Sequence, residues 1–177
     1  MSRIFVSLPL IISLLFGGVL NLSMTPEHRH SPVFMLTSPC DTVPELNQKI
    51  KDLVGRQIGK TVNRGECWDV AAMALNQTGA KWDKRYEFGR KVDPEKECIY
   101  PGDFIQFEDV TIKYTEGQKV FTETMGHHTA MIYEVKAKGV FVLAHQNTGT
   151  SGRKVGLSPL DLKTITKGEY QIFRPVQ

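Results

Sequence analysis

The sequence predicts an α+β domain in which two or more helices pack on an antiparallel sheet of five or six strands. The chain has 177 residues, enough for one compact domain with a core. Two segments with helical spacing of apolar residues come first, and segments rich in β-branched and aromatic residues follow from about residue 100. The net charge of +3 is spread along the chain without a basic run, so we expect no nucleic-acid partner.

Residues 1–24 are expected to be a signal peptide or an N-terminal membrane anchor. Arg3 precedes an apolar run to about Leu22, which suits the n- and h-regions of a signal peptide. The run of roughly 19 residues also approaches the length of a membrane span. No small-x-small cleavage motif is evident at its end, so cleaved and anchored forms both remain open, with a buried core helix as a third alternative. Either of the first two places the remaining chain outside the cytoplasm.

The next segment is rich in proline. From Thr25 to Pro44 it contains four of the chain's nine prolines and no sustained period. We expect residues 25–41 to form a linker or a strap, and residues 42–177 to form the folded domain.

Two amphipathic helices are predicted at the start of this domain. The first begins after Asp41 or Thr42 and ends at Gly55, and its apolar stripe is Leu46, Ile50, Leu53 and Val54. The second runs from Glu66 or Cys67 to Gln77 and is closed by Gly79. Cys67 then falls in the first turn, where unpaired amides and the helix dipole favour a thiolate and hence a nucleophile. A buried core cysteine is the alternative.

The rest of the domain reads as strands. A Pro-Gly turn precedes a strand from Phe104 to Phe107, and a second strand that continues to Tyr114 is left open. Residues 120–135 and 140–152 flank the turn "KAKG" and predict a β-hairpin. The C-terminal region predicts an edge strand near Lys154–Leu157, a helical turn after Ser158 or Asp161, and a closing strand Tyr170–Arg174.

The hairpin register can be argued from the turn. With an even-numbered turn Val135 lies opposite Val140, which places Ala130 opposite His145. A bulge at Gly139 would shift this register.

The same register gathers polar side chains on one face. His128 faces Asn147, so His128, His145 and Asn147 share a face while His127 points to the other side. A thiolate at a helix start beside a strand histidine, with a further polar group orienting that imidazole, is the arrangement of Cys/His catalysis. We therefore expect Cys67 to be set against this face.

Four motifs in this order carry a resemblance to a known superfamily: "GECWDVAAMAL", "PGDFIQFED", "GHHTAMIYEV" and "VLAHQN". Together they resemble the papain-like NlpC/P60 and CHAP superfamily. A closer likeness is to exported bacterial domains with G-E-C-W-D and H-Q-N, and to the cysteine-proteinase-fold domain of some fungal actin-patch SH3 proteins. The resemblance covers about residues 55–175 and implies a papain-like fold of the NlpC/P60-CHAP type.

The resemblance also implies roles for site residues. It makes Cys67 the nucleophile, His128 the base and His145 the orienting third member, and Asn147 matches an asparagine of many CHAP domains. Characterised relatives are often peptidoglycan peptidases or amidases, and others have no activity to carry over. The usual D-C-S-G around the nucleophile is E-C-W-D here, and the acidic calcium loop of some CHAP lysins is missing. These departures leave the substrate class open.

We therefore expect an exported cysteine hydrolase, periplasmic, extracellular or anchored on the outer face of the membrane. Its expected partner is a peptidoglycan peptide or another envelope amide, and we expect a monomer without a cofactor or a metal. A catalytically silent envelope-binding module on the same fold is the alternative.

The remaining cysteines, Cys40 and Cys98, could form a disulfide in an oxidising compartment once Cys67 is assigned to chemistry. Two unpaired thiols are the alternative.

Overall fold

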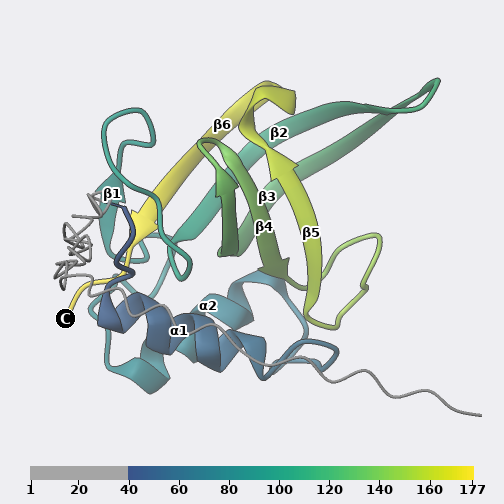
Figure 1. Cartoon of the computed structure of the whole chain (residues 1–177). Helices are drawn as coiled ribbons and strands as arrows, with labels where there is room; N and C mark the ends of the chain where they lie inside the picture. Colours follow the sequence, from purple (N-terminus) through teal and green to yellow (C-terminus); the bar gives the residue numbers. More distant parts are fainter. Residues whose placement is uncertain (1–39) are drawn as a thin grey trace, which may run out of the picture. The chain divides into compact units, whose positions relative to one another are not determined.

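The computed structural model describes residues 40–177, and it confirms the α+β class (Figure 1). The predicted segment 1–24, and all of the predicted strap 25–41 except Cys40 and Asp41, lie outside the described residues. Two helices precede a six-stranded antiparallel sheet in the described part of the chain. The elements are α1 (Glu45–Gly55), α2 (Cys67–Thr78), β1 (Arg90–Val92), β2 (Phe104–Glu116), β3 (Lys119–Ala137), β4 (Val140–His145), β5 (Gly156–Asp161), the 3₁₀ turn η1 (Leu162–Thr164) and β6 (Ile165–Arg174).

Both helices lie where the apolar spacing predicts them. Pro44 precedes α1, a position where its missing N–H costs no hydrogen bond. α2 ends at Gly79, whose left-handed backbone (φ 69°) lets Ala80 N–H bond the carbonyl of Leu75. The helices contact each other and β3, and they cover one face of the sheet.

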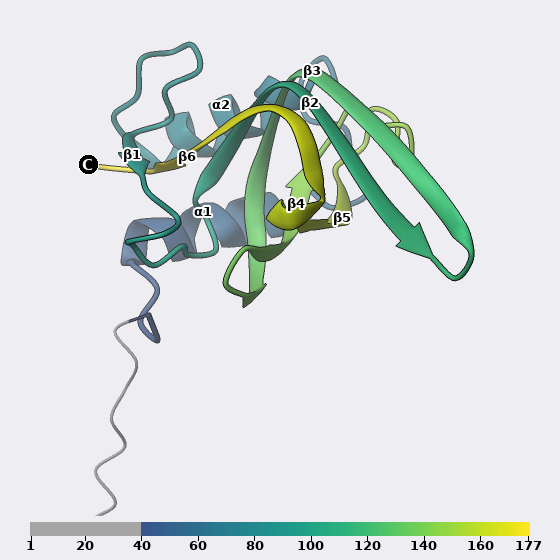
Figure 2. The same cartoon turned by 90° about the horizontal axis from the view of Figure 1, so that it is seen from above.

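The strands run in the order β1-β6-β2-β3-β4-β5. β2 continues two residues past Tyr114, and β3 extends the predicted segment 120–135 by one residue at its start and two at its end. Beyond Ile112, the last residue of β2 that pairs with β6, residues 113–122 form a two-stranded arm that projects beyond the other strands (Figure 2). β5 begins two residues later than the predicted edge strand and includes Ser158, and the predicted turn after Asp161 is η1. The three-residue strand β1 was not predicted.

The sheet separates two apolar clusters. On the helix side, Met131 and Ala144 pack with buried residues of both helices, including Ile50, Ala71 and Leu75. On the other face, the alternate residues Ala130, Ile132 and Leu143 pack with Phe107, Phe141 and Ile172. Alternation along β3 therefore assigns odd-numbered residues from His127 to Met131 to the helix side, and even-numbered residues to the opposite face.

A covalent bond ties the start of the described chain to the sheet. Cys40 and Cys98 form a disulfide with their Cα atoms 5.4 Å apart, as counting the cysteines suggested. Nearby, the guanidinium of Arg174 on β6 pairs with the buried carboxylate of Asp103, and its Nη2 donates to the Cys98 carbonyl. Within residues 40–177 no helix is both long and apolar enough to cross a bilayer.

Candidate active site

Cys67 is the first residue of α2, and a compact loop holds the start of this helix in place. The buried carboxylate of Asp69 accepts hydrogen bonds from the N–H groups of Arg64 and Glu66, at 3.0 and 3.1 Å. The first main-chain hydrogen bond of the turn is donated by Asp69 N–H to the carbonyl of Glu66 (3.0 Å). The amides of Cys67 and Trp68 precede this bond, so they point out of the helix end and can bind an anion.

Gln146 fixes the same loop from the sheet side. Its fully buried amide donates to the carbonyls of Val62 (3.0 Å) and Glu66 (2.7 Å) and accepts from Val62 N–H (3.1 Å). The motif H-Q-N drew attention only to the residues on either side of this glutamine. Gln146 is the first residue after β4, and its side chain reaches the loop that precedes α2.

The thiol of Cys67 lies at the edge of β3. Its Sγ atom is 4.0 Å from the carbonyl oxygen of His127. Ile132 exchanges hydrogen bonds with Gly102 and Asp103 on the β2 side, so by alternation the main-chain groups of His127 point away from β2. The thiol therefore approaches β3 at its edge, close to the plane of the sheet. The side chain of His127 projects to one face of this plane, and that of His128 projects to the other.

This position corrects one prediction. Cys67 was expected against the face that carries His128, but α2 packs on the opposite face, with Met131. The alternation of a strand identifies two faces without indicating which one a helix will cover. The contact of the thiol with β3 is with the main-chain carbonyl of His127, the residue before His128.

His128 and His145 do share a face, as the register predicts. Nε2 of His128 lies 2.9 Å from Nδ1 of His145, and Nε2 of His145 lies 2.7 Å from the hydroxyl oxygen of Ser158 on β5. Both imidazoles are buried. Burial lowers the pKa of His128 from 6.5 to about 4. Burial, and secondly the charge of His128, lower the pKa of His145 from 6.5 to about 3. Both rings are therefore neutral at pH 7.

The register that brings these histidines together differs from the prediction at the turn. Val135 pairs with Phe141 and Ala137 pairs with Val140, so the predicted pairing of Val135 with Val140 is wrong. The pairing of β3 with β4 shifts twice, between Val135 and Ala137 and between Ile132 and Glu134, and these shifts restore the predicted register before Met131. Met131 then pairs with Ala144, as the predicted register requires.

Asn147 does not join the histidines. β4 ends at His145, and Asn147 adopts a left-handed backbone (φ 62°) that turns the chain away. Its side-chain amide donates to a carboxylate oxygen of Glu66 (2.8 Å), which also pairs with Arg153 (3.3 Å). The expected place of Asn147 beside His128 is therefore wrong, because alternation stops where the strand ends.

A second imidazole-centred group faces the helix side, and the sequence analysis missed it. His127 Nδ1–H donates to a carboxylate oxygen of Glu108 on β2 (2.7 Å), and the ring edge of His127 meets Tyr86 with centroids 4.0 Å apart. Gln106 holds Glu108 by a 3.1 Å hydrogen bond, and Thr129 bonds Gln106 in turn (2.6 Å). The sequence did contain a signal for this group. Gln106 and Glu108 in "DFIQFED" are two residues apart on a predicted strand, so their side chains lie on the same face.

The loop that carries Tyr86 is anchored to α2. Trp68 Nε1–H donates to the carbonyl of Arg85, and the Trp68 ring packs against Trp82 with centroids 5.5 Å apart. Asp83 accepts hydrogen bonds from the N–H groups of Arg85 and Glu87. This loop therefore links Trp68, the residue after Cys67, to Tyr86, which contacts the ring of His127.

No group of three or more His, Cys, Asp or Glu side chains is placed to hold a metal ion anywhere in residues 40–177. Two open hollows, of about 410 Å³ between α1 and α2 and about 530 Å³ beside β1 and β6, do not include Cys67 or the histidines.

Comparison with known proteins identifies a family for this domain. Residues 44–177 match the family model described as the AIM3/BBC1 cysteine proteinase-fold domain. No curated protein matches the sequence. Among solved structures, the crystal structure of Ly7917 is 14% identical with a TM-score of 0.43, over 72% of this chain and 62% of that one. The chain therefore spans less than two thirds of that structure. On the family match, which confirms the resemblance to the fungal domain, the chain belongs to the AIM3/BBC1 cysteine proteinase-fold domain family.

Proposed function

We propose that the domain is a cysteine hydrolase that cleaves an amide bond by acyl transfer through Cys67, with a papain-like arrangement of the NlpC/P60-CHAP type. The observation that carries this proposal is the position of Cys67: it starts a helix and contacts β3 at His127, next to a histidine that is hydrogen-bonded to His145. Helix start, strand histidine and orienting group are the three parts that such catalysis requires.

His128 is the proposed base, and the hydrogen bonds define which nitrogen acts. If His145 Nε2–H donates to Ser158, then His145 Nδ1 accepts from His128 Nε2–H. Nδ1 of His128 is then left without a proton and can take one from a thiol or from water. The burial that keeps both rings neutral at pH 7 supports this tautomer chain.

The reaction then follows in two steps. The Cys67 thiolate attacks the amide carbonyl, and the N–H groups of Cys67 and Trp68 stabilise the oxyanion. His128 passes the thiol proton to the leaving amine as the C–N bond breaks, which gives a thioester. His128 next takes a proton from water, the resulting hydroxide attacks the thioester, and the acid and the thiol are released.

His127 with Glu108 is the competing base, because it projects to the side on which α2 packs. It is more exposed than His128 and already donates one ring N–H to a carboxylate. Separate substitution of His127 and His128 shows which of the two histidines is the base.

We propose further that the domain acts outside the cytoplasm, with a cell-wall or other envelope peptide as the first substrate to assay. The Cys40–Cys98 disulfide supports this location because disulfides persist in oxidising compartments. The apolar segment near the N-terminus is the second support. Attachment to the membrane through that segment, if it is not cleaved, is part of the same proposal.

Thiol reactivity and hydrolysis test the proposal together. Cys67 is the cysteine outside the disulfide, so iodoacetamide should label a single site in the oxidised protein. We expect Cys67 to react well before a free cysteine at pH 6.5, and Cys67→Ala to abolish hydrolysis of peptide amides or muropeptides. An unreactive thiol and no hydrolysis in the parent protein would indicate the binding-module alternative.

A further inference from the structure

β3 is far longer than the strand beside it. It contains 19 residues, but β4 pairs with it only from Met131 to Ala137. From Thr129 back to Lys119, the side of β3 away from β2 has no neighbouring strand within residues 40–177. We call the part from Lys119 to His127 the β3 edge. Figures 1 and 2 show its outer part on the projecting arm.

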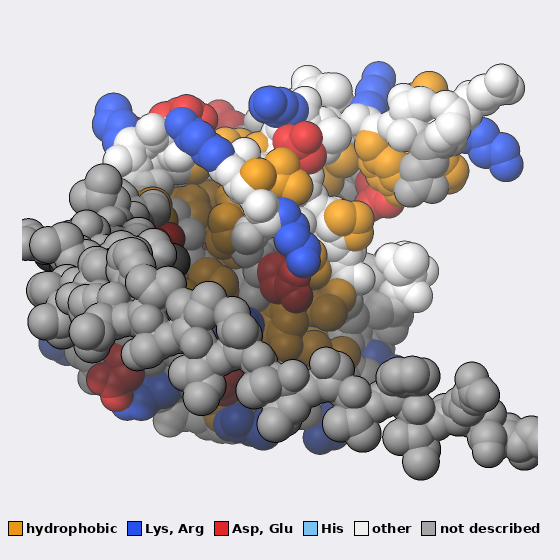
Figure 3. All heavy atoms as spheres, in the orientation of Figure 1, with side chains coloured by type: hydrophobic (Ala, Val, Ile, Leu, Met, Phe, Trp, Pro, Cys, Tyr) orange, Lys and Arg blue, Asp and Glu red, His pale blue; other side chains and the backbone are white. Residues whose placement is uncertain are grey.

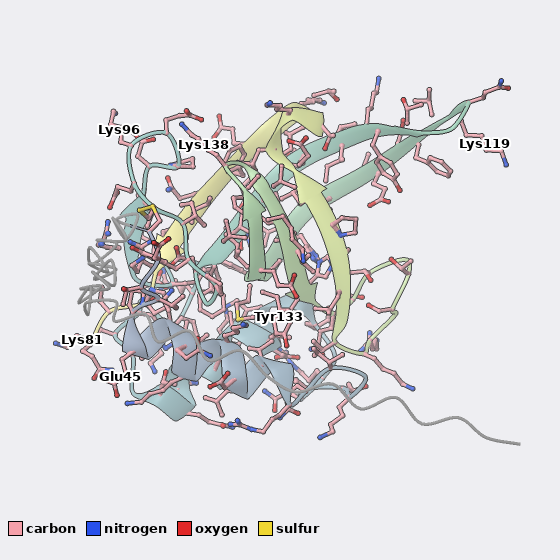
Figure 4. The ribbon with its side chains drawn as sticks, in the orientation of Figure 1. Glu45, Lys81, Lys96, Lys119, Tyr133 and Lys138 are labelled. Carbon is pink, nitrogen blue, oxygen red and sulfur yellow. A yellow bond between two sulfur atoms is a disulfide. The ribbon has the colours of Figure 1, made fainter. Side chains whose placement is uncertain are left out.

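The β3 edge is open to solvent. All residues from Lys119 to His127 are exposed except the half-buried Met125, whereas His128 and Thr129 are buried. Lys119 lies at the tip of the arm, away from the body of the domain, and Tyr133 on the same strand lies near the helices (Figure 4). A polypeptide could therefore approach the β3 edge without any rearrangement of the domain.

The edge begins at the candidate nucleophile. The carbonyl of His127 points away from β2, and the thiol of Cys67 lies 4.0 Å from it. This is the position beside β3 that β4 would occupy if it continued past His145. A strand placed there would have its own main chain next to the sulfur atom.

We propose that the substrate is an extended L-polypeptide that adds as a strand to the β3 edge and so presents its main-chain carbonyl to Cys67. The proposal rests on the function proposed above and names the substrate class for the same site. Unpaired N–H and C=O groups of an exposed edge bind an extended peptide by the hydrogen bonds of a sheet, with side-chain contacts adding selectivity.

The length and surface of the edge define what it would bind. About nine residues from Lys119 to His127 give an edge of roughly 30 Å at 3.3 Å per residue. Val120 is 70% exposed and Phe121 is 37% exposed near its outer end. Figure 3 shows hydrophobic side chains on the arm, with lysine or arginine near its outer end. We therefore expect several residues on one side of the cleaved bond to be bound, with apolar side chains favoured.

This substrate differs from a peptidoglycan stem peptide. A regular strand requires free N–H groups and side chains that alternate between its two faces, whereas N-methyl groups or mixed L- and D-residues interrupt this pattern. Among the envelope peptides proposed above, the edge therefore favours a linear protein segment over a stem peptide that contains D-residues.

The test tethers a peptide to Cys67 and so does not depend on affinity. One sample is labelled with the chloromethyl ketone of acetyl-Val-Thr-Val-Ala, and a matched sample is labelled with iodoacetamide, which forms the same thioether without a peptide. Amide hydrogen exchange over residues 119–129 is then compared. We expect at least tenfold slower exchange at some of these amides in the peptide-labelled protein only.

A peptide with N-methyl groups on the alternate amides that would face the β3 edge is the control and should give no protection. Equal exchange in the two labelled samples, or protection confined to residues 82–89, would overturn the edge proposal alone. If neither reagent labels Cys67, both the edge proposal and the proposed function are overturned, because both need a reactive thiol.

Discussion

His128 and His145 form a buried imidazole pair, with Nε2 of the first 2.9 Å from Nδ1 of the second. A hydroxyl group, that of Ser158, lies at the far end of the pair, 2.7 Å from His145 Nε2. Because a neutral imidazole has one donor and one acceptor, this chain can run in only two directions. One direction leaves His128 Nδ1 free as a base, so the proton positions in the pair decide whether the site can act.

Substitution of adjacent histidines gives a matched test of the base. His128→Ala should reduce hydrolysis on the order of a hundredfold or more, because it removes the proposed base. His127→Ala should change the rate only a few-fold, because in the proposed mechanism His127 is not the base and its ring N–H already donates to Glu108. The measurement is kcat/KM on a peptide substrate, with thermal unfolding to verify that both variants fold. The reverse order of effects would make His127 with Glu108 the base.

The protein should lose stability in mild acid. The folded pKa values of about 4 for His128 and about 3 for His145 lie below the unfolded value of 6.5, so the unfolded chain binds more protons between these limits. The stabilisation by the neutral pair is thus present above about pH 6.5 and is lost as the pH falls toward 4. From pH 7 to pH 5 we expect each histidine to lower the free energy of unfolding by about 2 kcal/mol, so the pair lowers it by about 4 kcal/mol.

Urea unfolding at the two pH values measures this loss. His145→Gln should reduce the difference between pH 7 and pH 5, whereas His127→Gln, at an exposed position, should preserve it. An identical unfolding free energy at pH 7 and pH 5 in the parent protein would contradict the prediction.

Gln146 should matter more than Asn147, although only Asn147 was singled out from the sequence. Gln146→Ala removes three hydrogen bonds from the loop before Cys67 and leaves the buried N–H of Val62 without its acceptor, whereas the carbonyls of Val62 and Glu66 keep the bonds from Gly65 and Asp69; we expect a cost of about 1–3 kcal/mol. Asn147→Gly is the control, since glycine tolerates its positive φ and only the exposed bond to Glu66 is lost. Chemical denaturation and the rate of Cys67 alkylation measure both effects. Equal losses in the two variants would argue against this role of Gln146.

The disulfide should be detectable by mass and by stability. The oxidised protein should take up one iodoacetamide under denaturing conditions, and the reduced protein should take up three. Replacing Cys40 and Cys98 with serine should lower the free energy of unfolding by about 3–4 kcal/mol, since the bond joins residues 58 apart. Three modified cysteines without a reductant would disprove the bond in the isolated protein.

The sequence was informative where local chemistry decides the structure. Caps and apolar spacing predicted both helices, and alternation predicted the pairing of His128 with His145. Pairings that depend on distant strands were missed. The contact of Ser158 with His145 requires β5 to lie next to β4, and the pair of Glu108 with His127 requires the register of β2 on β3.

Two kinds of error have identifiable causes. The irregularities between Ile132 and Ala137 cannot be read from a turn of Lys, Ala and Gly, because several bulge positions satisfy the same pattern. β1 has three residues, of which two are charged, so it carries no strand signal of its own. It forms because β6 supplies a partner.

The place of β6 within the sheet also bears on how the chain folds during synthesis. β6 is made after the other five described strands, yet it lies between β1 and β2. Until residues 165–174 leave the ribosome, β1 lacks its partner and one side of β2 is open, so the nascent sheet can be completed only after the body of the domain has emerged. A chaperone that shields β2 during this interval would protect the folding intermediate most exposed to aggregation.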